Sequence, residues 1–197
     1  MGEIERRGEN RELLDGTFTA YDLALTMSYS REISKLTNAG INIKGIHQKI
    51  ENEQAYGVAI DFGLLQKTAI KDLQLGLSLQ NLGPKMSFIT GNFNLPLTVN
   101  GAVSYKLFNS PFAIAMNLGH EVYTAKTDVT FGTEFWFGNM VALRGKYLFL
   151  NENKIDNLSN FSFGAGIKIS KFGIDYSFGD YKELGNTHRL SFSGKFR

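Results

Sequence analysis

Apolar residues alternate with polar or small residues in successive segments of about ten residues along most of this chain. The clearest segment is 73–80, in which four leucines alternate with Gln, Gly, Ser and Gln. Successive side chains of a β-strand point to opposite faces, so each segment forms a strand with one apolar and one polar face. The repetition of this pattern predicts an all-β, antiparallel protein.

Counting the alternation gives about eleven strands. We expect them at 23–30, 41–44, 55–64, 73–80, 97–107, 112–119, 128–137, 141–149, 161–169, 173–178 and 188–196. Short links at 37–38, 66–68, 108–111, 138–139 and 170–171 alternate with longer ones at 47–55, 81–96, 120–128, 151–160 and 179–187. Short turns at one end and long loops at the other are typical of a transmembrane β-barrel. The pair Gly138-Asn139 suits a primed hairpin turn.

Composition agrees with a barrel and excludes a helical membrane protein. The mean hydropathy is -0.16, and no run approaches the roughly 18 apolar residues that a spanning helix requires. A barrel strand exposes only every second residue to lipid, so its average hydropathy stays near neutral. The chain has no cysteine, 21 basic and 19 acidic residues, which predicts no disulfide, no thiolate metal site and no nucleic-acid partner. We therefore predict a barrel in the bacterial outer membrane, with its lipid as a partner.

The number of predicted strands bears on whether the chain contains every strand of its barrel. If the short turns are periplasmic, about eleven strands place residue 1 outside the cell, whereas bacterial barrels normally have an even number of strands. Missing upstream strands explain this most simply, and a miscounted strand is the alternative. Residues 1–12 include basic residues but no apolar run, so we expect no export signal there. We expect a polar N-terminal segment or extracellular loop at 1–21 and a single barrel domain at 22–197.

Three segments carry a resemblance to a known family. They are 16–25, the Leu-Gln-Asn-Leu-Gly-Pro motif within 75–85, and 185–191. Here the chain resembles the PorV/PorQ family of outer-membrane proteins, which are related to the FadL long-chain fatty-acid transporters. The resemblance implies a barrel of about fourteen strands, so that the N-terminal part would be absent here. It also implies one of two functions: a surface component of a type IX protein-secretion pathway, or passive uptake of hydrophobic molecules.

Charged residues on the polar faces are candidates for lining the lumen. They could define a permeation path, or they could fill the interior by pairing across strands. The candidates are Lys44, Asp61, Lys106, Asp128, Glu134, Arg144, Lys146, Lys168 and Asp175.

Two apolar segments also suggest functions. The connection after residue 81 is more apolar than a solvated loop should be, with Met86, Phe88, Ile89, Phe93 and Leu95. It could fold over the barrel mouth, dock a hydrophobic small molecule, bind a secretion-system partner, or simply pack on the barrel rim. The last strand presents Leu190, Phe192 and Phe196 on one face. We expect this strand to be the assembly signal that the barrel assembly machinery reads.

No catalytic or metal site is predicted. His47, His120 and His188 lack the spacing of metal ligands and read as polar residues at strand ends. The chain has no Gly-x-Ser-x-Gly elbow, and Ser191 near His188 is a poor nucleophile candidate. We expect a non-enzyme without a cofactor. Besides the two membrane functions, a soluble all-β domain with a core face and a solvent face remains open.

Overall fold

The computed structural model describes residues 3–7, 13–51, 53–88, 91–107, 110–150, 161–180 and 186–194. Strands make up most of it. Their bounds are β1 Glu3–Arg7, β2 Leu13–Ser34, β3 Thr37–Ile50, β4 Glu53–Lys67, β5 Leu73–Leu82, β6 Met86–Phe88, β7 Gly91–Phe93, β8 Thr98–Lys106, β9 Phe112–Glu121, β10 Lys126–Phe137, β11 Val141–Leu150, β12 Phe161–Ile169, β13 Phe172–Asp180 and β14 Asn186–Gly194. This part of the chain holds no helix with the length and hydropathy to span a bilayer.

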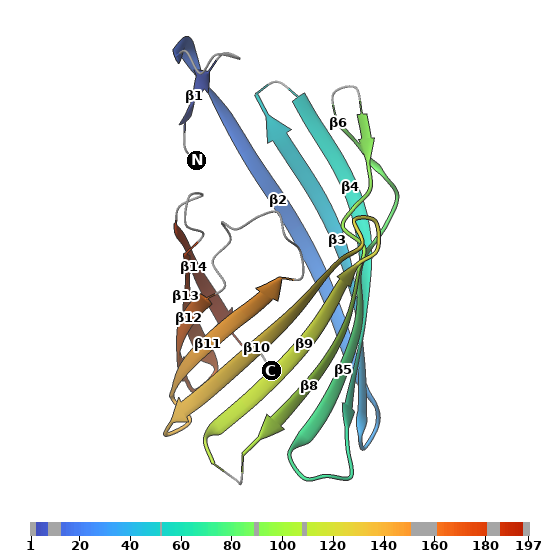
Figure 1. Ribbon diagram of the computed structural model, residues 1–197, viewed down its shortest axis with the longest axis vertical. Coiled ribbons are helices and arrows are strands. Elements are labelled where there is room, and N and C mark those ends of the chain that lie inside the picture. Colours follow the sequence, from blue (N-terminus) through green and yellow to red (C-terminus); the bar gives the residue numbers. More distant parts are fainter. Residues whose placement is uncertain are drawn as a thin grey trace.

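The strands form one antiparallel sheet that follows the chain order. Its order is β1-β2-β3-β4-β5-β8-β9-β10-β11-β12-β13-β14, and β6 and β7 form a separate hairpin. Figure 1 shows tilted strands in a strongly curved sheet, as in the wall of a barrel. Among the described residues no pairing joins β14 to β1 or β2. The prediction of an all-β antiparallel fold is confirmed, and all eleven expected strands are present, as β2–β5 and β8–β14.

The two faces of the sheet differ sharply in polarity. On the face that we call the outer face, apolar side chains lie open, with Leu25 77%, Leu77 60% and Phe192 73% exposed. The inner face carries small and charged residues such as Ala59 and Asp61, which are 1% and 5% exposed. A soluble protein rarely leaves a continuous apolar surface of this kind open to water. The outer face is therefore suited to lipid, which argues against a soluble domain.

Two of the expected long loops are wrong. Strands β3 and β4 pair without interruption from Thr37↔Gln66 to Ile50↔Glu53, so the connection expected at 47–55 shrinks to 51–52. The connection expected at 120–128 likewise shrinks to 122–125, between β9 and β10. In both pairs, β3 with β4 and β9 with β10, the backbone hydrogen bonds continue beyond the segments in which apolar residues alternate. Polar side chains near a strand end do not stop such a ladder, because the backbone supplies the pairing.

The N-terminal boundary also differs from the expectation. Strand β2 has 22 residues and begins at Leu13, and β1 pairs with it from Glu3↔Thr19 to Arg7↔Leu13. The boundary expected between residues 21 and 22 therefore lies inside a strand, and 13–21 belong to the sheet. Polar residues and Gly16 interrupt the apolar alternation here, so the pattern alone does not reveal the strand.

The primed turn between β10 and β11 is confirmed. Gly138 and Asn139 both have positive φ, at 56° and 59°. The Met140 N–H donates a hydrogen bond of 3.1 Å to the Phe137 carbonyl. Only glycine and, less readily, asparagine adopt these angles cheaply, so the dipeptide fixes the hairpin locally.

Candidate functional site

The inner face carries the candidate site. Register places all nine predicted lumen-lining charges on this face, where they alternate with the outward apolar residues. Their role in permeation stays a prediction. Five of the nine form two separate ion-paired clusters, and the other four form no ion pair with the described residues.

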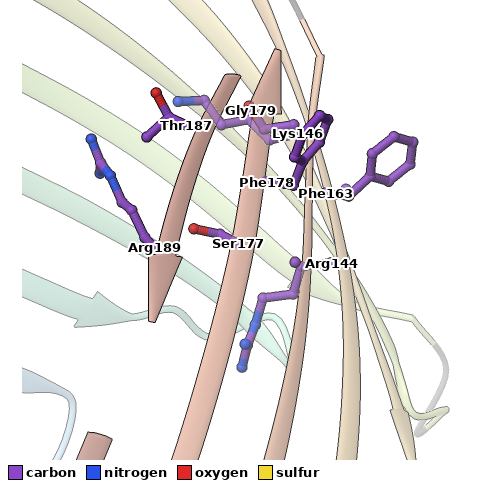
Figure 2. Close-up of a pocket in the computed structure, with 11 residues that line it drawn as sticks. Arg144, Lys146, Phe163, Ser177, Phe178, Gly179, Thr187 and Arg189 are labelled. Carbon is purple, nitrogen blue, oxygen red and sulfur yellow. The ribbon is translucent and has the colours of Figure 1, made fainter. Parts of the chain in front are cut away.

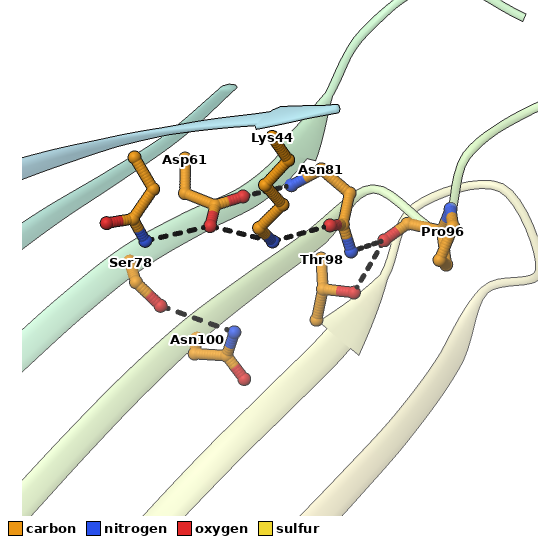
Figure 3. Close-up of polar contacts among 8 residues, drawn as sticks. Lys44, Asp61, Ser78, Asn81, Pro96, Thr98 and Asn100 are labelled. Carbon is orange, nitrogen blue, oxygen red and sulfur yellow. Dashed lines mark hydrogen bonds and ion pairs between the residues drawn. The ribbon is translucent and has the colours of Figure 1, made fainter. Parts of the chain in front are cut away.

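The first cluster surrounds Asp61. Its carboxylate accepts hydrogen bonds from the Asn42 amide at 3.0 Å and from the Asn81 backbone N–H at 2.8 Å, and it lies 2.7 Å from the Lys44 ammonium. Lys44 also donates to the Asn81 Oδ1 at 2.9 Å, and the Asn81 amide donates to the Pro96 carbonyl at 3.0 Å. Figure 3 shows that these hydrogen bonds and the ion pair form one connected network. The cluster therefore links β3 and β4 to both ends of the connection between β5 and β8.

Asn81 makes this link because of its backbone. The pairing of β4 with β5 shifts register between Ile60 and Phe62, and Asn81 there has a φ of 61°. Asparagine tolerates this left-handed conformation better than other side chains. The sequence analysis predicted a long connection that begins at residue 81 but missed Asn81 and Asn42 as partners of Asp61, because a bulge gives no signal in the alternation.

The connection between β5 and β8 folds onto the inner face of β4. Met86 and Leu95 are 1% and 5% exposed and pack with Ala55 and Ala59. A Cβ on Gly57 would lie only 2.5 Å from the Met86 sulfur. The row of small residues on β4 therefore forms a seat for Met86.

This packing bears on the alternatives that the sequence left open for the connection. Met86 and Leu95 are occupied by contacts with β4, as the rim-packing alternative requires, because burial against alanine removes them from water. Phe93 is 39% exposed. The Phe88 side chain and Ile89 lie outside the described residues, so a docking role for them stays a prediction.

The second cluster centres on Arg144 of β11. Its Nε lies 2.7 Å from the Glu134 carboxylate and its Nη1 lies 2.6 Å from the Asp175 carboxylate. The Trp136 indole N–H also donates to Glu134 at 2.6 Å. A Cβ on Gly166 would collide with the Asp175 carboxylate and come within 2.9 Å of Arg144 Nη1, so this glycine makes room for the pair. Two carboxylates share one guanidinium, which leaves the cluster net negative.

A pocket with basic side chains lies next to the Arg144 cluster. It has a volume of about 250 Å³ and extends over β11 to β14. Figure 2 shows Lys146, Ser177 and Arg189 on the side of the sheet opposite to Phe163. Sequence reasoning named Arg144 and Lys146 but missed Arg189, because the terminal strand was interpreted through its apolar face.

A wider hollow lies on the other half of the inner face. It has a volume of about 420 Å³. Small residues form its floor, and the Asn100 amide donates to the Ser78 hydroxyl at 3.4 Å beside it, as Figure 3 shows. The floor residues are Gly40, Gly63, Gly76 and Ala102.

The remaining predicted residues lie apart from these sites. Leu190 and Phe192 are exposed on the outer face of β14, and Phe196 is outside the described residues. The three histidines bond to neighbouring side chains at strand ends, His47 to Gln54, His120 to Thr127 and His188 to Tyr176. Ser191 and His188 alternate to opposite faces of β14, so they do not form a nucleophile and base. No group of metal-ligating side chains occurs among the described residues.

Comparison with known proteins supports the fold. No family model matches the chain, and no curated protein matches it either. Among solved structures it is similar to the Ralstonia pickettii toluene transporter TbuX, with a TM-score of 0.63 and 12% identity, over 93% of this chain and 69% of that one. The described sheet therefore shares the β-barrel fold of this transporter. The finer assignment to PorV/PorQ stays a prediction, because a likeness at this identity shows the fold alone.

Proposed function

We propose that this protein is an outer-membrane β-barrel that provides a passive path for small hydrophobic molecules. One observation carries the proposal: the curved sheet has an apolar outer face and a polar, partly hollow inner face, in the fold of a toluene transporter. An apolar band suits membrane lipid, and a lumen with hollows suits solute passage. A transporter as structural neighbour also supports a non-enzymatic role.

The inner face offers two elements of such a path. The hollow over Gly63 and Ala102 leaves space along the wall, and the connection that contains Met86 and Phe93 reaches over β4. In this connection Met86 and Leu95 are buried, whereas Phe93 is exposed, so an entering hydrophobic molecule can contact the Phe93 side chain. A functional barrel also requires that the two edges of the sheet be paired, at β14 on one side and at β1 with the part of β2 beyond it on the other, because unpaired backbone groups are not tolerated in hydrocarbon. The total of about fourteen strands that the resemblance implies stays a prediction.

Uptake measurements on two adjacent residues test the path. Ala102 lies on the inner face over the hollow, and Val103 next to it points outward with 37% exposure. We expect Ala102→Trp to lower toluene uptake by intact cells several-fold, because the indole fills the hollow. Val103→Trp should leave uptake near the parental rate, since a large apolar residue suits lipid. Equal uptake by the two variants at equal protein level would contradict the proposal.

A role in protein secretion is the second candidate, carried by the resemblance to PorV/PorQ. Replacement of Phe88, Ile89 and Phe93 by Ser distinguishes the two roles. In a hydrophobic transporter the change lowers uptake of a long-chain amphiphile at unchanged protein level. In a secretion component it leaves uptake untouched, and secreted proteins accumulate in the periplasm or lose surface attachment.

A further inference from the structure

The pocket over β11 to β14 is built from two parallel rows of inner-face residues. Register aligns Lys146, Ser162, Gly179 and Thr187 in one row, and Arg144, Gly164, Ser177 and Arg189 in the next. The basic side chains therefore stand at the two ends of the rows, on β11 and β14, with small residues between them. Adjacent strands are about 4.8 Å apart, so three strand spacings separate these ends. The long basic side chains at both ends can therefore reach one ligand that lies over the small residues between them.

The charges around this pocket are not balanced. Arg144 is bound to both Glu134 and Asp175. Lys146 and Arg189 have no acidic partner among the residues that the structure describes. Figure 2 shows both side chains on the same side of the sheet. The two free cations therefore give the pocket a positive potential of its own.

Hydroxyl groups complete the donor set. Ser162, Ser177 and Thr187 line the pocket, and none of the three has a side-chain hydrogen bond to another described residue. Cationic nitrogens together with free hydroxyls are the donors that carboxylate and phosphate oxygens accept. A hydrophobic molecule would leave all of these donors without partners, which is costly. The volume of about 250 Å³ suits a small ligand.

We propose that the Lys146–Arg189 pocket binds a small anion through oxygen acceptors, either a carboxylate or a phosphate. The pocket then gives the inner wall an anion-selective step in addition to its apolar features. The inference deepens the proposed function and rests on it only for the idea that solutes reach the inner face. Binding itself does not depend on transport.

Equilibrium dialysis tests the proposal with the full chain folded in detergent micelles. The probes are radiolabelled benzoate, inorganic phosphate and benzamide, which has the shape of benzoate without its charge, each corrected for binding to empty micelles. We expect saturable binding of benzoate, phosphate or both, at least tenfold tighter than that of benzamide. Binding of one anion alone identifies the carboxylate or the phosphate as the ligand chemistry. Equal binding of benzoate and benzamide, or binding of neither anion, overturns the proposal.

Matched variants locate the site. Lys146→Gln and Arg189→Gln should each weaken anion binding about tenfold, because each removes charge-assisted hydrogen bonds. Lys146→Arg should retain binding. Lys106→Gln is the control, because Lys106 lies on the same inner face on β8, away from the pocket. An equal loss with Lys106→Gln would mean that only overall charge matters and would overturn the site.

Two readouts separate the possible failures. Far-UV circular dichroism and heat-dependent gel migration show whether each variant is folded, and the comparison of benzoate with benzamide needs no variant at all. Toluene uptake by the Ala102→Trp and Val103→Trp pair tests transport independently. Failed anion binding with a normal uptake difference would remove the anion site and leave the proposed function standing.

Discussion

Lys44 on β3 and Asp61 on β4 form an ion pair on the inner wall, with 2.7 Å between Nζ and Oδ2. The Asp61 side chain is 7% exposed and the Lys44 side chain 22%. Burial makes the pair dependent on both members, since a single buried charge has neither water nor a counter-ion. Through Asn81 the same pair holds the connection that carries Met86 and Leu95.

Lys44→Met should therefore destabilise the folded protein. We expect a loss of about 2–4 kcal/mol in the free energy of unfolding, because Asp61 keeps its two other hydrogen bonds but loses its counter-ion. Urea unfolding in lipid vesicles measures this. Lys106→Met is the control, because no ion pair involves Lys106 among the described residues. An unchanged unfolding midpoint for Lys44→Met would show that the pair contributes nothing to stability.

The two faces of β5 give a second prediction. Leu77 is 60% exposed on the outer face, and Ser78 lies on the inner face beside Asn100. Leu77→Arg should cost about 2–4 kcal/mol of membrane stability near the midplane, whereas Ser78→Arg keeps its charge hydrated. The folded fraction in lipid vesicles, read by gel migration without heating, compares them. Equal folding of the two variants would refute the assignment of the faces.

The close packing of Met86 against Gly57 gives a third prediction. Gly57→Val should destabilise the protein by about 1–3 kcal/mol, because the new side chain overlaps the Met86 sulfur and forces it out of its seat. Met86→Ala in the same chain should relieve part of this loss. A double-mutant cycle of unfolding free energies measures the coupling, and strict additivity would mean that the two residues do not compete for space. Gly45→Val on β3 is a matched control, since nothing lies within 4 Å of a Cβ there.

The apolar outer face of β14 gives a fourth prediction. Replacing Leu190 and Phe192 with Ser should reduce assembly into the outer membrane, because the barrel assembly machinery would lose the apolar face of the terminal strand. Replacing the inner-face Ser191 and Ser193 with Ala should not. Fractionation of cells followed by gel migration measures the folded, membrane-bound share. Normal assembly of the first variant would exclude this strand face as the signal.

The sequence by itself determined that the eleven strands β2–β5 and β8–β14 form and which face each of their residues takes. Alternation is a local property with a period of two, so each segment shows which residues share a face without reference to any neighbour. For the same reason the Gly138-Asn139 turn could be predicted, since its backbone angles depend on those two residues alone. The outward position of Leu77 and the inward position of Arg144 follow from this pattern.

Only the tertiary structure decided which inward residues meet. Arg144 binds Asp175 two strands away, and Arg189 reaches the same pocket as Lys146, because pairing register aligns residues that are far apart in the chain. The register shift at Asn81 and the packing of Met86 on Gly57 do not alter the alternation of apolar and polar residues, so the sequence pattern does not reveal them. Backbone hydrogen bonds also extend strands through polar residues, as between β3 and β4. Local pattern therefore sets the face of each side chain, whereas long-range pairing sets its partners.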